Sequence, residues 1–102
     1  MAYLTVEGRP TRLLPMVSYQ LFHFDFCPFC MRVRQFLEQS GLSIPLRNIH
    51  RDPEAYRELL AGGGSQQVPC LRIEAEGMVR WLYESEDIIR YLKDHALPSA
   101  QP

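Results

Sequence analysis

The chain has 102 residues, of which 46% are hydrophobic and 23% charged, and its formal net charge at pH 7 is −1. This length is enough for one hydrophobic core but not for two domains. The charge balance gives no indication of nucleic-acid or anionic-membrane binding, and no apolar stretch approaches the roughly 20 residues of a membrane-spanning helix.

The first 15 residues show little periodicity and contain two prolines. We therefore expect an N-terminal extension over residues 1–15 and one domain over residues 16–102. Glu7, Arg9 and Arg12 interrupt any apolar core of a signal peptide. Without export, the expected compartment is the cytoplasm, where cysteines stay reduced and a CxxC pair is more often catalytic or metal-binding than structural.

A strand, a helix and a second strand are predicted in the first half of the domain. Residues 19–26 form a near-continuous apolar run, which favours a strand buried on both faces. From Pro28 onward apolar residues recur at helical spacing, and Ser40-Gly41 ends that helix. Residues 44–50 predict the next strand, and a connection too long for a hairpin indicates that it runs parallel to the first.

The next segment begins with a clear helix signal and ends in glycines. Asp52-Pro53 supplies an N-cap and a first-position proline, which predict a helix through about Ala61. The run Gly62-Gly63-Gly64-Ser65 breaks the pattern, and we expect a flexible loop there.

The last third of the chain predicts a hairpin and a helix. Residues 70–74 and 78–83 read as its two strands, joined around Glu76-Gly77. We expect Ser85 to cap the final helix and Pro98 to close it. The predicted order is strand, helix, strand, helix, strand, strand, helix.

The pair Cys27 and Cys30 stands where the first strand meets the first helix. Two cysteines three positions apart at a helix start lie one turn from each other, close enough for a small disulfide loop. Cys27 also faces unpaired backbone N–H groups and the positive end of the helix dipole, which favour the reactive thiolate. This spacing beside a strand–helix pattern indicates a thioredoxin-like redox motif.

A CxxC pair can also be half of a zinc site, but tetrahedral zinc needs four ligands. The remaining candidates are Cys70, His23, His50 and His95, and none forms a second pair with ligand spacing, so we expect no metal. Cys70 is predicted to be a small buried hydrophobe. None of the histidines has a partner spacing that indicates a general base.

The chain resembles the glutaredoxin family, in particular the branch built like the N-terminal domain of glutathione transferases. Three motifs carry the resemblance in the expected order: residues 24–30 (FDFCPFC), residues 67–69 (QVP) and residues 84–88 (ESEDI). Together the match spans about residues 18–95. The resemblance implies a thioredoxin-like α/β fold, in which a four-stranded mixed sheet is flanked by three helices.

The resemblance also implies a role for each matching position. Cys27 would be the exposed nucleophile and Cys30 the buried resolving thiol. The backbone of Val68, ahead of a cis proline, would meet the cysteine part of glutathione, and the start of the last helix would hold the γ-glutamyl end. The implied glutathione-binding residues are Phe29, Gln67, Val68, Pro69, Glu84 and Ser85.

Two departures from the usual family pattern concern the thiolate. Many small glutaredoxins place a basic residue three positions before the first cysteine, where this chain has Phe24, and the acidic Asp25 follows it. A carboxylate close to Cys27 opposes its ionisation, so the helix terminus must supply most of the pKa depression. Phe29 replaces the more usual tyrosine, and Gln67 stands where threonine is common.

The activity that the resemblance implies is glutathione-dependent thiol–disulfide exchange. Glutathione would be the reductant, the substrates would be disulfide-bonded or glutathionylated proteins, and we expect a monomer. One alternative is a glutathione-transferase-like binding module, for which we would also expect an all-helical C-terminal domain. Another is an iron–sulfur carrier in which Cys27 and glutathione ligate a cluster across a dimer, although Pro28 disfavours it.

Overall fold

The computed structural model describes residues 17–97, so residues 1–15 and Pro98, for which we made predictions, lie outside the described part. The strand and helix order predicted from the sequence is confirmed, and the fold is thioredoxin-like. No helix within residues 17–97 is long and apolar enough to cross a bilayer. The elements in chain order are β1 (Val17–His23), α1 (Pro28–Ser40), β2 (Leu46–Asn48), α2 (Pro53–Glu58), the π-helical turn η2 (Leu59–Gly63), β3 (Cys70–Ala75), β4 (Met78–Tyr83) and α3 (Ser85–His95).

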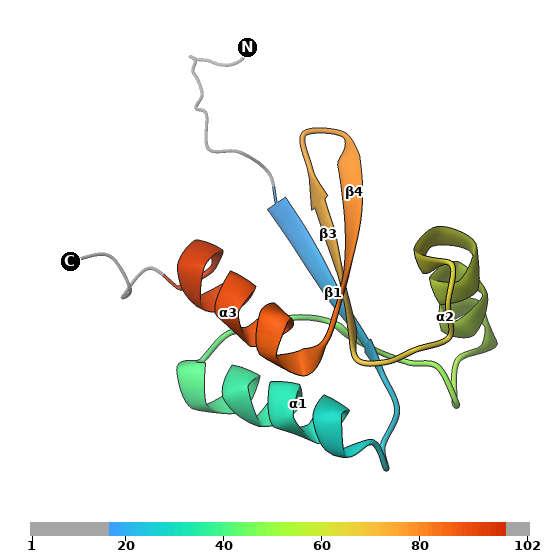
Figure 1. The fold of residues 1–102 in the computed structure, drawn as a ribbon, viewed down its shortest axis with the longest axis horizontal. Helices are drawn as coiled ribbons and strands as arrows, with labels where there is room; N and C mark the ends of the chain where they lie inside the picture. Colours follow the sequence, from blue (N-terminus) through green and yellow to red (C-terminus); the bar gives the residue numbers. More distant parts are fainter. Residues whose placement is uncertain (1–16, 98–102) are drawn as a thin grey trace.

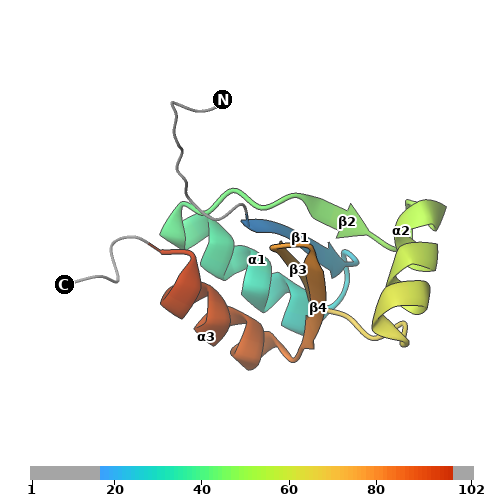
Figure 2. The same ribbon diagram turned by 90° about the horizontal axis from the view of Figure 1, so that it is seen from above.

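The four strands form one mixed sheet in the order β2-β1-β3-β4. β2 runs parallel to β1 as predicted, whereas β3 is antiparallel to both β1 and β4. The β3–β4 turn has positive φ at Glu76 and Gly77, as a two-residue hairpin loop requires. Helices α1 and α3 lie side by side on one face of the sheet, and α2 lies on the opposite side (Figures 1 and 2).

The α1/α3 face of the sheet is aliphatic. Helix α1 turns its buried positions toward β1, because residues three and four apart share one face of a helix. The predicted burial on both faces holds for the last three residues of β1, whereas its first four residues are exposed or half-buried. The main cluster on this face consists of Leu21, Val33, Leu37, Leu71, Ile73, Ile88 and Leu92.

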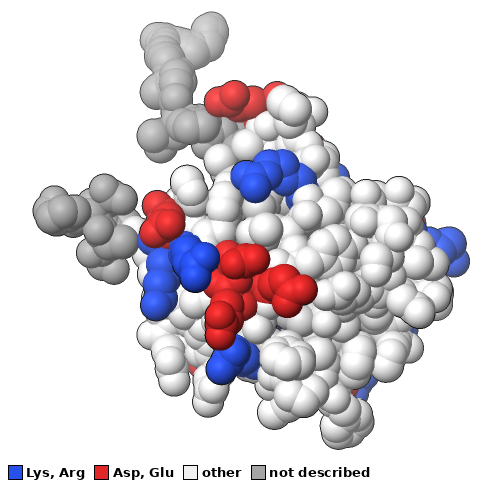
Figure 3. Space-filling model, in the orientation of Figure 1, with Lys and Arg blue, Asp and Glu red and all other residues white. Residues whose placement is uncertain are grey.

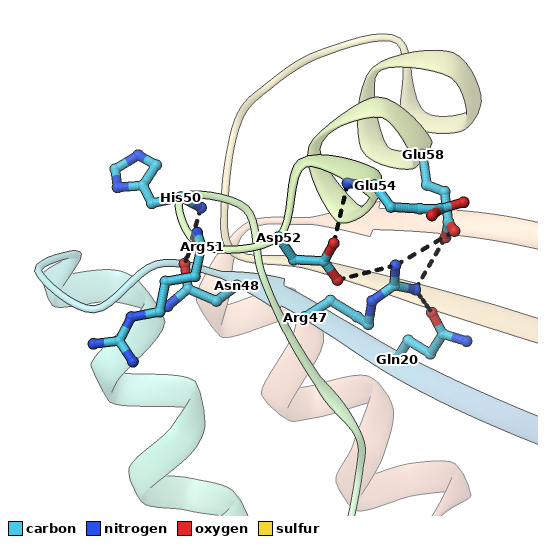
Figure 4. Close-up of polar contacts among 8 residues, drawn as sticks. All are labelled: Gln20, Arg47, Asn48, His50, Arg51, Asp52, Glu54 and Glu58. Carbon is cyan, nitrogen blue, oxygen red and sulfur yellow. Dashed lines mark hydrogen bonds and ion pairs between the residues drawn. The ribbon is translucent and has the colours of Figure 1, made fainter.

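The α2 face combines a small aromatic core with an ion-pair network. Arg47 on β2 lies 5.3 Å from the centre of the Phe22 ring. Its guanidinium donates to Glu58 at 3.0 Å and to Gln20 at 2.9 Å, and lies 3.7 Å from Asp52 (Figure 4). One partly buried side chain thereby ties β1, β2 and α2 together.

The glycine run after α2 differs from the predicted flexible loop. The chain continues past α2 as η2, and Gly62 and Gly63 belong to this turn. A Cβ atom at Gly62 would collide with the Trp81 ring, and one at Gly63 would collide with the Tyr83 hydroxyl. These glycines are therefore required for close packing of η2 against β4.

Candidate functional site

The Cys27 sulfur lies at the N-terminus of α1. Cys27 is the N-cap residue, and its Sγ accepts a hydrogen bond from the Cys30 N–H at 3.2 Å. The thiol donates to the Val68 carbonyl, with Sγ and O 3.9 Å apart. The residue is only 6% exposed, so the expectation of an openly exposed sulfur was wrong. The segment that carries Val68 contacts this sulfur.

The Cys30 thiol is fully buried on the sheet side of α1. Burial raises the pKa of Cys30 to about 12, and its hydrogen bond with Cys27 acts in the same direction. The Phe24 backbone and the Arg34 charge lower this pKa by less. Cys30 is therefore protonated at neutral pH, and no disulfide joins it to Cys27 in this structure.

The segment before β3 approaches the first cysteine with its backbone. The Val68–Pro69 peptide bond is cis, which confirms that prediction. Ser65 Oγ accepts a hydrogen bond from the Gln67 N–H at 3.1 Å and helps to fix the turn. The Gln67 side chain in turn donates to a Glu84 carboxylate oxygen at 3.5 Å. The segment thus links α1 to the start of α3.

A cleft of about 370 Å³ lies beside this segment, between the first turns of α1 and α3. All the binding residues implied by the sequence line it. Cys27 is not among the lining residues, but its thiol donates to the carbonyl of Val68, which is. The lining residues are Phe29, Arg32, Gln67, Val68, Pro69, Glu84, Ser85, Glu86 and Asp87.

The start of α3 differs from the sequence prediction. Glu84, rather than Ser85, is the N-cap residue, and it makes no side-chain capping hydrogen bond. Ser85 is the first helical residue and is buried. The first backbone bond within this helix runs from the Ile88 N–H to the Glu84 carbonyl at 2.9 Å. The preceding N–H groups thus have no partner within the helix and lie where an anion can be held.

The backbone of Glu84 is strained, because its φ of 76° lies in a region that side-chain-bearing residues rarely occupy. Such a conformation costs on the order of 1–3 kcal/mol and persists only where surrounding structure enforces it. This strain places the Glu84 side chain over the cleft, within reach of Gln67.

Charged residues that the sequence analysis did not assign to the site also line the cleft. They are Arg32, Glu86 and Asp87. Arg32 of α1 faces Glu86 of α3 at 3.5 Å, and both side chains are more than half exposed. Figure 3 shows acidic side chains gathered over the start of α3, with basic side chains to either side. All three residues lie within two turns of a helix start, and this position is the sequence signal that could have identified them.

The Asp25 carboxylate does not lie unpaired near the thiolate. It pairs with Arg51 at 2.8 Å and accepts from the Asn48 side chain at 3.2 Å. The Arg51 guanidinium thus offsets the negative charge of this carboxylate. Within the described part of the chain, no three His, Cys, Asp or Glu groups are arranged to hold a metal ion.

Comparison with known proteins shows one family. A model described as "Glutathione S-transferase, N-terminal domain" matches residues 21–99. A search of curated protein sequences found no significant match.

Solved structures show the same likeness. Maleylacetoacetate isomerase from Anaeromyxobacter dehalogenans 2CP-1, with glutathione in its active site, is 26% identical with a TM-score of 0.62; the match covers 83% of this chain and 41% of the isomerase. A Nu-class transferase from Haemonchus contortus is 26% identical with a TM-score of 0.54, over 78% of this chain and 36% of that one. A thioredoxin-like protein, 21% identical with a TM-score of 0.57 over 74% and 99%, shares the fold. This chain spans less than half of the first two proteins.

Proposed function

The chain belongs to the family of glutathione S-transferase N-terminal domains, and we propose that it acts as a glutathione-dependent thiol–disulfide oxidoreductase of the glutaredoxin type. The observation that carries the proposal is the paired arrangement of Cys27 and Cys30. One sulfur caps a helix and accepts an N–H, while the other is a buried thiol one turn away. A transferase that only binds glutathione has no need of the second thiol.

The proposed reaction has two exchange steps. Cys27 thiolate attacks the glutathione sulfur of a glutathionylated protein; a Cys27–glutathione disulfide forms and the protein thiolate leaves. A second glutathione can then attack the bound glutathione sulfur, which forms oxidised glutathione and frees the Cys27 thiolate. Alternatively, Cys30 attacks the Cys27 sulfur and releases the first glutathione. When Cys30 attacks, a Cys27–Cys30 disulfide results, and two further glutathione molecules reduce it to two thiols.

The cleft supports the glutathione part of the proposal. We assign the γ-glutamyl carboxylate to the free N–H groups at the start of α3 and the neighbouring ammonium to Glu84. The Val68 backbone, already 3.9 Å from the Cys27 sulfur, is placed to pair with the cysteine part of the ligand. Phe29, Gln67 and Pro69 complete the walls.

The test is a coupled assay that follows glutathione oxidation during reduction of a small glutathione mixed disulfide. We expect turnover by the wild-type protein, loss of turnover in Cys27→Ser, and partial turnover in Cys30→Ser, because glutathione can replace Cys30 in the second step. A wild-type protein that is folded but inactive in this assay would refute the proposal.

A second candidate function is transfer of glutathione to an electrophile or glutathione-assisted isomerisation. The family match and the two transferase-fold structures favour it. In that case Cys27 activates the glutathione sulfur and Cys30 has no role. Conjugation of glutathione to a chlorinated nitrobenzene, unchanged in Cys30→Ser and without disulfide reduction, would identify this function instead.

A further inference from the structure

His23, at the end of β1, faces helix α1, which carries the buried Cys30. Successive residues of a strand point to opposite faces of the sheet. Leu21 packs with Val33 of α1, whereas Phe22 belongs to the cluster on the α2 face. His23 therefore points toward α1, at the carboxyl end of β1, where the first turns of that helix carry Cys30.

This interface contains buried polar atoms without partners. His23 is 4% exposed, and its Nδ1 has no hydrogen-bond partner within residues 17–97. The Nε of Arg34, four residues beyond Cys30 on α1, is buried and equally without a partner in this part of the chain. Buried polar atoms are normally paired with protein groups or with ordered water. The end of β1 and helix α1 thus each contribute one buried polar atom that lacks a protein partner within residues 17–97.

The Cys30 proton has no direct route to solvent, because the residue is fully buried. The charged and titratable groups that act on His23 are Arg34 from α1 and Asp25 from the loop after β1. Burial first, and then the Arg34 charge, lower the pKa of His23, while Asp25 raises it by less. His23 is therefore neutral at pH 7 and able to accept a proton.

We propose that His23 is the proton acceptor for Cys30 when this thiol attacks the Cys27–glutathione disulfide. This inference rests on the proposed function. The Cys30 proton passes to the His23 imidazole, directly or through one ordered water, as the Cys30 sulfur bonds to the Cys27 sulfur. The Cys27–glutathione bond breaks, the glutathione sulfur leaves with the electron pair, and His23 then returns the proton to it or to water. Arg34 stabilises the negative charge that develops on Cys30.

The experiment isolates this step. Reduced protein is mixed with oxidised glutathione, quenched with acid at intervals, and analysed by mass spectrometry for the glutathionylated and internal-disulfide forms between pH 5 and 9. In the wild type, the conversion rate should rise with pH and then level off above the His23 pKa. In His23→Gln it should fall about 100-fold at pH 7, a typical general-base effect, and rise tenfold per pH unit throughout. His95→Gln, which alters an exposed histidine at the end of α3, should match the wild type.

A second arm separates proton transfer from a structural effect. In the Cys30→Ser background, added glutathione attacks the Cys27 mixed disulfide without Cys30, so His23→Gln should change that rate less than twofold. Equal slowing in both backgrounds, or no slowing in either, would overturn the role of His23. If the proposed function fails, the result is different. The wild-type protein would then convert its glutathionylated form to the internal disulfide normally in single turnover, but it would reduce no glutathionylated substrate at steady state.

Discussion

The two faces of the sheet differ in what holds them and in what they carry. The buried cluster of the α1/α3 face is aliphatic, and Cys27, Cys30 and the cleft lie at the end of this face where α1 and α3 begin. The α2 face is held by aromatic rings, the Arg47 network and close glycine packing. Its charged groups Arg47, Asp52 and Glu58 are paired with one another.

The difference shows how the site is assembled from both faces. Elements of the α1/α3 face supply the reactive sulfur and the two helix N-termini. The α2 face supplies no reacting group, but η2 and the following segment bring Val68 to Cys27. We therefore expect changes on the α2 face to alter stability, and changes at the end of the α1/α3 face to alter chemistry.

The largest contrast is expected between the cysteines of the two faces. Cys27→Ser should abolish turnover, whereas Cys70→Ser, on the α2 face, should keep it. Burial raises the pKa of Cys70 to about 11, so this thiol is a poor nucleophile at neutral pH. Timed alkylation with iodoacetamide followed by peptide mapping should label Cys27 first. Earlier labelling of Cys30 or Cys70 would show that the nucleophile is misassigned.

Gly62→Ala should destabilise the α2 face by about 1–3 kcal/mol, because its added methyl group collides with Trp81. Urea unfolding measures this loss, and the alkylation rate of Cys27 in the folded variant should not change. Gly64→Asn is the matched control, since it keeps the left-handed backbone at a position with open space. A Gly62→Ala protein as stable as Gly64→Asn would mean that η2 does not pack on β4 in this way.

Glu84→Ala should raise the glutathione concentration needed for half-maximal turnover about tenfold, the loss of one charge-assisted hydrogen bond. The alkylation rate of Cys27 should stay the same, since the role we propose for Glu84 is to bind the ligand and not to act on the sulfur. Glu38→Ala, an exposed carboxylate on α1, is the control and should leave both quantities unchanged. Unaltered glutathione dependence in a folded Glu84→Ala protein would place the ligand elsewhere.

The smallest expected effect is on the stability of the folded protein in acid. Since the folded-state pKa of His23 lies below its usual 6.5, the unfolded chain binds more protons as the pH falls. The stability that His23 contributes is therefore complete above pH 6.5 and decreases as the pH falls from there through the folded-state pKa. Urea unfolding at pH 7 and pH 5 should show a smaller difference for His23→Gln than for the wild type. The difference in His95→Gln should equal that of the wild type.

The sequence was sufficient to predict much of the site, because the informative signals were local. Pro28 after Cys27, and Pro69 after Val68, fix the backbone within a few residues of themselves. The position of the implied binding residues around one cleft followed from the order of the motifs. The burial of Cys27 was not predictable in this way, because its sulfur contacts the Val68 carbonyl, 41 residues later in the chain.

Local patterns determined the element order, the helix starts and the pair of thiols, because capping and periodicity act over one or two turns. Only the tertiary structure decided that Gly62 packs closely against Trp81 instead of lying in a flexible loop, since Trp81 belongs to a strand that is distant in the sequence. It also decided that His23 is buried and subject to the charge of Arg34 from α1, which no spacing of histidines in the sequence could indicate. The physical reason is the same in both cases: burial and proximity depend on how the strands and helices pack, and side chains far apart in the chain set each other's environment.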